Sequence, residues 1–409
     1  MNRKQLMTLL VALVIVGGAG LVLLQRHQQS WTEAETQIGQ KLFKDYKVND
    51  IAAVHIKGDT DLTLERKDNG WCVQQRGDYP ANMTQIKELL IKMGDLKVVQ
   101  SDAIGASQLA RMHLAEPGKG ADSAILVEFK DAAGKTLESL LLGKKHTHES
   151  DRPSPMPYGD EGYADGRYVM LGTDTKTVLT IPDALNNLDP KPTEWLDKDF
   201  FKVEKPEKIS FVSTNANNSW TISRATESSP WVLAEPKPGE VLDTNKVSSL
   251  SSALGYPSFV DVVADAAPDK TGMDNPMTVT IETFDHFTHT LKIGHKTPEN
   301  QYDFNISVTA DIPTARTPGK DEKPEEKTKL DKEFQDKTKQ QQETLHKEQA
   351  LGHWTYLVNN WLVDPFIRDR SQLMVEKKTE KKDASATDQD KATSEPADSD
   401  PTPVPGLPK

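Results

Sequence analysis

The first hydrophobic pattern along the chain is an uncharged apolar run that begins at Leu6 and ends at Leu24, after a positively charged lead-in. As a helix this run would be about 28 Å long, at about 1.5 Å per residue, which is close to the hydrocarbon thickness of a bilayer. A cleaved signal peptide is the alternative, but cutting at the small residues 18–20 would leave an apolar stretch at the new terminus. We therefore expect an uncleaved signal anchor.

Residues 51–201 begin with strand-like alternation and continue with a helical segment. Leu62 and Leu64 alternate with polar residues, and a polar turn that ends in Asn69-Gly70 leads to Trp71. Asn-Gly between two such runs is a strong hairpin signal. Residues 82–93 place apolar side chains at helical spacing and are followed by a glycine, so they predict a helix.

The same order of elements recurs after Lys208, which indicates an internal duplication. The matched positions include Leu64 with Ile222, Trp71 with Trp231, Leu89 with Leu250, Gly143 with Gly294, and Tyr168 with Tyr302. Each copy is expected to hold two strands, a helix and three further strands. Two copies predict tandem domains, whereas three or more would suggest a solenoid.

A polar insert interrupts the second copy at about residues 316–350. It contains nine Lys or Arg residues and nine Asp or Glu residues, with Leu330 and Phe334 as a weak apolar stripe. Such a stretch cannot bury a core, so both a solvated charged helix and disorder are open interpretations. Residues 376–409 are also polar and are typical of a disordered tail.

These patterns predict an α+β protein with one transmembrane helix and two tandem, internally duplicated mixed α/β domains. We assign residues 1–29 to the cytoplasmic lead-in and anchor and residues 30–47 to a stalk. The first repeat domain is expected at residues 48–202, the second at 203–375, and the disordered tail at 376–409.

Charge and cysteine content narrow the classes of function. The net charge is −12 at pH 7, and an acidic surface repels phosphate, so nucleic-acid binding is not expected. Cys72 is the only cysteine, so this chain alone cannot form an intrachain disulfide, a Cys-rich zinc site or an iron–sulfur cluster.

One local cluster has the residue types of a metal site: His146, His148 and Asp151. Alternate histidines with a nearby carboxylate can converge on one ion. The cluster lacks further spaced ligands and precedes a loop rich in proline and glycine, so a solvated loop is expected and the metal site is only a weak candidate. Because the sequence has no phosphate-binding loop, nucleophile elbow or zinc-protease helix, we expect no catalytic residues and no cofactor.

Other reactive or aromatic side chains are interpreted as structural. Cys72 lies on a predicted strand whose counterpart in the second copy carries a valine, so a small buried hydrophobe serves equally well there. Trp71 and Trp231 occupy matched strands and are expected to be core anchors rather than ligand stackers. His286 and His289 flank Phe287 in a predicted turn, where histidines are usually solvated.

Several short motifs resemble those of a known family. They are Trp71-Cys72-Val73 after a polar turn, Tyr79-Pro80-Ala81 before a helix, the Leu-Leu-Leu-Gly strand end at residues 140–143, and the closing segment at residues 195–201. In these motifs the chain resembles the domain-of-unknown-function family 4340 (DUF4340), over about residues 51–201 and more loosely over 209–364. The insert at about 316–350 departs from that pattern.

The resemblance implies one N-terminal anchor helix and a bulk that faces the cell exterior or periplasm. Some members of the family resemble partners of ABC-type transport or gliding-motility components. The resemblance supplies no catalytic residues.

The favoured hypothesis is a non-catalytic accessory or scaffold component of a cell-envelope assembly, such as an ABC-type transporter or a gliding-type system. We expect it in the bacterial inner membrane, held by the run from Leu6 to Leu24, with protein partners such as transporter subunits. The alternative is a periplasmic ligand-binding module for envelope polysaccharide or peptide, with a groove between the two copies. A third hypothesis is a metal-dependent enzyme that uses His146 and His148.

Overall fold

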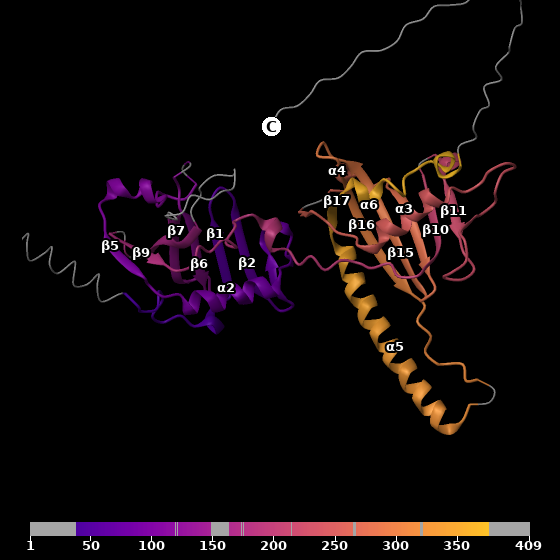
Figure 1. The fold of residues 1–409 in the computed structure, drawn as a ribbon, viewed down its shortest axis with the longest axis horizontal. Coiled ribbons are helices and arrows are strands. Elements are labelled where there is room, and N and C mark those ends of the chain that lie inside the picture. The colour runs from indigo at the N-terminus through magenta and orange to yellow at the C-terminus, as the bar shows by residue number, and fades with distance from the viewer. Residues whose placement is uncertain are drawn as a thin grey trace, which may run out of the picture. The chain divides into compact units, whose positions relative to one another are not determined.

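The fold is seen in a computed structural model (Figure 1). It describes residues 38–118, 120, 122–148, 163–172, 174, 176–213, 215–264, 267–319 and 322–375. The predicted anchor, from Leu6 to Leu24, and the predicted tail both lie outside these ranges. Within these ranges, none of the helices is long and apolar enough to cross a membrane. By their contacts, the described residues up to Met374 belong to one unit.

Residues 53–181 form a nine-stranded sheet with one α-helix, α2 (Met83–Asp95). The strands are β1 (Ala53–Lys57), β2 (Asp61–Lys67), β3 (Gly70–Val73), β4 (Tyr79–Pro80), β5 (Gln100–Ala103), β6 (Ile125–Lys130), β7 (Thr136–His148), β8 (Tyr163–Leu171) and β9 (Thr177–Ile181). Their order in the sheet is β4-β3-β2-β1-β6-β7-β8-β9-β5.

Residues 206–359 form an eight-stranded sheet with the order β12-β11-β10-β14-β15-β16-β17-β13. Its strands are β10 (Pro206–Val212), β11 (Trp220–Ser223), β12 (Val232–Leu233), β13 (Asp261–Val263), β14 (Met277–Thr283), β15 (Phe287–Lys296), β16 (Gln301–Ala310) and β17 (Thr355–Asn359). The helices of this part are α3 (Thr244–Gly255), α4 (Pro268–Thr271), α5 (Pro324–Ala350) and α6 (Asn360–Val363).

Both sheets are antiparallel, and from β3 to β5 and from β12 to β13 their strand orders correspond one to one. Helix α2 follows β4 in the first part, and helix α3 follows β12 in the second. The mixed α+β class is therefore confirmed as two antiparallel sheets with a few helices. The shared order supports the duplication, and the exact domain boundaries stay a prediction.

The first hairpin and helix form where their sequence patterns indicate. Leu62 and Leu64 are fully buried on one face of β2, and the turn at Gly70 has φ +117°, a value that glycine adopts without strain. Helix α2 begins after Asn82, whose side chain accepts a hydrogen bond from the amide of Gln85 at 3.1 Å. Its buried face holds Ile86, Leu89, Leu90 and Met93, and the helix runs beneath the first sheet in Figure 1.

The matched glycines of the two copies share one structural task. A Cβ on Gly143 would collide with the carbonyl oxygen of Met112, and a Cβ on Gly294 would collide with that of Thr271. In each copy a short helical turn crosses the strand at this glycine. The duplicated glycine is therefore required by close backbone approach.

Strand pairing corrects one of the matched positions. Lys145 lies opposite Arg167 on β8, and its counterpart Lys296 lies opposite Tyr302 on β16. Tyr302 thus corresponds to Arg167 and not to Tyr168. The predicted match was shifted by one residue because both tyrosines follow polar loops of unequal length.

The chain before β1 differs from the expected stalk. Leu42 and Phe43 are buried in the hydrophobic core, and Phe43 packs edge-on against Phe129 with ring centroids 6.0 Å apart. Residues 39–46 therefore pack with the first sheet. Of the two predicted core tryptophans, Trp71 is buried, whereas Trp231 is half-buried beneath the guanidinium of Arg224, 4.9 Å from the ring centroid.

The charged insert is a helix in the structure. Helix α5 is 27 residues long and connects β16 to β17. Only its Glu348 is buried. In Figure 1 the helix leaves the second sheet at its C-terminal end and extends away from it.

Candidate functional site at the foot of helix α5

The C-terminal half of α5 covers a cavity of about 350 Å³ on the second sheet. Strands β14 and β15 and the segment before β10 complete its walls. The lining residues that carry charge or hydrogen bonds include Lys202, Thr283, Asp285, His289, Lys337 and Glu348. The cavity is polar, unlike the apolar pockets that usually hold drug-sized ligands.

A buried pair of side chains closes the inner end of this cavity. Nε2 of His289 lies 2.9 Å from Oε2 of Glu348, and the two side chains are 2% and 7% exposed. The other carboxylate oxygen of Glu348 accepts a hydrogen bond from the backbone amide of Lys202 at 2.8 Å. The pair therefore connects helix α5 both to the sheet and to the segment that enters it.

His289 is buried because of its place in β15. Residues Phe287, His289, Leu291 and Ile293 alternate along the inward face of this strand. The expectation of a solvated turn histidine is therefore wrong for His289. His286 does lie in a turn, with φ +66°.

The second ring nitrogen of His289 has no partner. Nδ1 is buried and makes no hydrogen bond with the described residues, while the ring centroids of Phe287 and Phe201 lie 6.1 and 6.2 Å from that of His289. An unsatisfied buried nitrogen costs about 1–3 kcal/mol. The pair therefore fixes the foot of the helix at some cost in stability.

Asp285 makes a second set of contacts to the helix. Its carboxylate lies 3.0 Å from Nζ of Lys337 and 3.2 Å from Nζ of Lys205, and its carbonyl oxygen accepts a hydrogen bond from Gln341 at 3.1 Å. Burial raises the pKa of Asp285, but hydrogen bonds from Lys337 and Lys205 outweigh burial and lower it below its usual value. Asp285 is therefore held as an anion that binds α5 to the sheet.

The cavity offers charges for binding but no evident nucleophile. The hydroxyl of Thr283 donates a hydrogen bond to the carbonyl oxygen of Phe287 at 3.3 Å, so it is not oriented toward His289 as a nucleophile would be. The arrangement can hold the helix and offer both signs of charge to a polar group. The catalytic or non-catalytic nature of the protein stays a prediction.

The structure describes only part of the predicted metal cluster. Nδ1 of His146 lies 2.6 Å from Oδ1 of Asp165, and its ring packs edge-on against Tyr168. Asp151 and the side chain of His148 lie outside the described residues. The metal site therefore stays a prediction.

Within the described ranges, Glu65, Cys72 and Asp78 bring three possible metal ligands within 4.8 Å of one another. Burial, followed by the negative charge of Asp78, raises the pKa of the Cys72 thiol to about 11. Without a metal ion the thiol is therefore protonated at neutral pH, and a metal would have to displace its proton in order to bind. Cys72 is buried, as expected of a small core residue.

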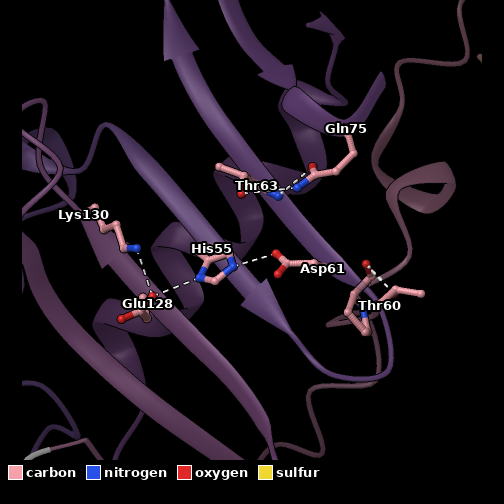
Figure 2. Close-up of polar contacts among 8 residues, drawn as sticks. His55, Thr60, Asp61, Thr63, Gln75, Glu128 and Lys130 are labelled. Atoms are coloured by element: carbon pink, nitrogen blue, oxygen red, sulfur yellow. Dashed lines mark hydrogen bonds and ion pairs between the residues drawn. The ribbon is translucent and has the colours of Figure 1, made fainter. Parts of the chain in front are cut away.

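A polar network covers the open face of the first sheet (Figure 2). The ring of His55 lies between two carboxylates, with Nδ1 2.9 Å from Glu128 and Nε2 2.7 Å from Asp61. Burial raises the pKa of Glu128, but hydrogen bonds from His55 and Lys130 outweigh it and lower the pKa below its usual value. His55 and Glu128 are direct cross-strand neighbours, so the network stabilises the pairing of β1 with β6.

Sequence reasoning did not single out Glu348 or assign His289 to the core. For His289 a signal was available, since it continues the alternation of Phe287 and Leu291 that predicts an inward face. For Glu348 no signal stands out among the nine acidic residues of the insert. Its burial depends on the place where the helix meets the sheet.

Comparison with known proteins gives one family match over part of the chain and no function. Neither the curated proteins nor the solved structures gave a significant match. One family model does match part of the chain. The matched part includes β8 and β9 of the first sheet and β10 to β13 of the second, so it spans the junction of the two copies and is shorter than the resemblance suggested. Residues 157–276 match the family model described as Domain of unknown function (DUF4340), which confirms the resemblance for this segment of the chain.

Proposed function

We propose that this chain is a non-catalytic accessory or scaffold component of a cell-envelope assembly, such as an ABC-type transporter or a gliding-type system, and that helix α5 contacts the partner. One observation carries the proposal. Helix α5 has 27 residues, of which only Glu348 is buried. A helix this polar contributes little to the core. Its presence as an insert between two strands of a folded sheet therefore favours a role in contacts outside the domain.

The contacts of α5 support a role as a projecting arm. Its C-terminal half is held by His289, Asp285 and the cavity around them. At about 1.5 Å per residue the helix is about 40 Å long, so much of it extends beyond this foot. Lys329–Glu333 and Lys339–Glu343 are exposed pairs at i,i+4 spacing, which stabilise a helix by only a few tenths of a kcal/mol.

The charge of the arm suits a protein partner. The insert has nine basic and nine acidic residues, so its surface offers both signs. Exposed charges of this kind contribute to the rate and specificity of association more than to affinity. The proposed anchor from Leu6 to Leu24 would keep this arm at the membrane surface, on the outer side.

Co-purification from cells tests this proposal. The full-length protein carrying Lys329→Glu and Lys339→Glu, both about four-fifths exposed, is compared with the wild type and with a control carrying Lys87→Glu and Lys97→Glu. The control lysines are exposed and lie on α2 and just after it. We expect the α5 variant to lose envelope partners that the control retains. Recovery of the wild type alone, or equal recovery of partners by all three proteins, would overturn the proposal.

A periplasmic ligand-binding module for envelope polysaccharide or peptide remains the alternative function. It is favoured by one separate observation, a cavity of the first sheet that contains a buried cation.

A further inference from the structure

We propose that the first sheet carries a binding site for an organic anion, whose carboxylate or phosphate group meets the guanidinium of Arg167. The site is a cavity of about 400 Å³ lined by residues of β7 and β8, the β1–β2 turn and the segment after β9. It involves no residue of helix α5, so it is independent of the accessory role proposed for that helix and deepens the alternative, ligand-binding function.

Arg167 is a buried cation without a carboxylate partner among the described residues. The residue is 8% exposed and forms no ion pair with another described residue. Nε donates a hydrogen bond to the carbonyl oxygen of Gly143 at 2.8 Å, and Nη1 donates to those of Ala184 and Leu185 at 3.2 and 3.4 Å. Nη2 donates no hydrogen bond to a described residue. It is not among the fully buried side-chain atoms that lack a partner, so it is open to the cavity side of the residue.

Burying a charge in this way is costly. A buried cation is normally paired with an anion, because carbonyl dipoles replace only part of its hydration. Burial also lowers the pKa of the Arg167 guanidinium, although arginine stays charged in proteins. An anion at Nη2 would complete the solvation of this cation.

The second copy shows that the fold does not need a cation at this position. Tyr302 is the counterpart of Arg167. Its hydroxyl donates a hydrogen bond to Asp364, which lies in the segment after β17. Arg167 likewise reaches Ala184 and Leu185 in the segment that follows β9. A neutral side chain can therefore tie down this segment, and the positive charge is what the first copy adds.

Two further cations line the same cavity. Lys145 is the direct cross-strand neighbour of Arg167 and forms no ion pair among the described residues. Like charges directly opposite each other destabilise a sheet, and an anion between them removes that repulsion. Lys191 lies 3.6 Å from the carboxylate of Asp189, and Asp59 contributes the other carboxylate of the lining from an exposed turn.

The wall of the cavity is held in place by hydrogen bonds within the protein. Leu185 is buried with φ +47°, a strained value for leucine, and its carbonyl oxygen accepts from Arg167. The hydroxyl of Thr60 donates to the carbonyl oxygen of Pro190 at 2.9 Å, a contact drawn in Figure 2. The indole of Trp195 donates to the carbonyl oxygen of Asp189 at 2.7 Å. These bonds hold the segment against the sheet.

The lining also indicates the kind of anion. Nη2 carries two N–H groups, and Lys145 supplies a mobile ammonium, so both can donate to one carboxylate or phosphate group. Ile125, Leu188 and Pro190 give the remaining wall an apolar character that suits the carbon part of an organic ligand.

Titration of the full-length protein with two probes tests the site. Inorganic phosphate and succinate are each titrated by isothermal calorimetry at constant ionic strength. Lys145→Gln removes an exposed cation of the cavity with little risk to folding, and Lys144→Gln is the matched control, because Lys144 is the adjacent exposed lysine and does not line the cavity. We expect saturable binding that Lys145→Gln weakens about tenfold and that Lys144→Gln leaves unchanged.

Arg167→Gln is expected to abolish the binding, and its far-ultraviolet circular dichroism reports whether it folds. If it does not fold, the two lysine variants still decide the question. A preference for phosphate or for succinate identifies the anionic group and supports the proposal in either case. Absence of saturable binding to both probes, or equal weakening by the two lysine variants, would overturn it.

Discussion

At the scale of single residues, the pair of His289 and Glu348 is a buried contact between helix α5 and the sheet. The two groups are buried and 2.9 Å apart. Removing one partner leaves an uncompensated buried group, whereas replacing both by apolar residues removes both buried polar groups and leaves only the amide of Lys202 without its acceptor.

We therefore predict that His289→Leu lowers the free energy of unfolding by about 3 kcal/mol, because it leaves the carboxylate of Glu348 buried without its partner. Combining it with Glu348→Leu should recover at least half of that loss. Urea unfolding of the full-length protein, followed by tryptophan fluorescence, measures both values. A single variant as stable as the wild type, or a double variant less stable than the single one, would contradict this account of the pair.

Cys72 gives a prediction about pH. With a pKa of about 11 in the folded protein, the thiol ionises far less at pH 8 than an unfolded cysteine with its ordinary pKa near 8.5. Ionisation alone should slow alkylation by iodoacetamide about two hundredfold at pH 8 relative to the protein in urea. The rate should rise with pH until about pH 11. Mass spectrometry of quenched samples checks this, and equal rates in the folded and unfolded states at pH 8 would disprove it.

At the scale of elements, the two copies use a glycine at the same point of the same strand. Gly143 of β7 and Gly294 of β15 each let a short helical turn cross with its carbonyl oxygen against the strand. This crossing explains why the Leu-x-x-Gly pattern survives in both copies, although the residues around it differ.

We predict that Gly143→Ala and Gly294→Ala each lower the free energy of unfolding by about 2 kcal/mol or more, because the added Cβ forces the backbone apart. Gly105→Ala is the control, since a Cβ at that position meets no atom within 4 Å. The control should stay within about 0.5 kcal/mol of the wild type. Thermal unfolding of the three variants tests this, and similar values for all three would contradict the crossing as the reason for the glycines.

At the scale of the whole molecule, most of the architecture could be predicted from periodicity. The hairpin around Asn69-Gly70, helix α2 and the recurrence of the element order in the second copy follow from local patterns. The sequence predicts five strands in each copy, but the sheets have nine and eight, because short edge strands such as β4 and β12 have two residues each and leave no periodic pattern. For the insert, both a charged helix and disorder were open interpretations, because its sequence offers too weak an apolar face to decide between them. The structure resolves this in favour of a helix whose foot is fixed by tertiary contacts.

The two cavities could not be predicted in the same way. Arg167 and Gly143 lie 24 positions apart, and His289 and Glu348 lie 59 apart. Each contact depends on strand register or on where an insert returns to the sheet. A single buried polar residue among polar neighbours leaves no periodic signal, which is why sequence patterns predicted the layers better than the sites.

Site-specific photo-crosslinking in cells tests the central claim most directly. A photoreactive amino acid is placed at Lys329 on the exposed part of α5 and, as the control, at Lys87 on the exposed face of α2. If α5 is the contact element, position 329 should capture a defined envelope protein, such as a transporter subunit, and position 87 should not. Capture of the same proteins at both positions, or of none at position 329, would contradict the account.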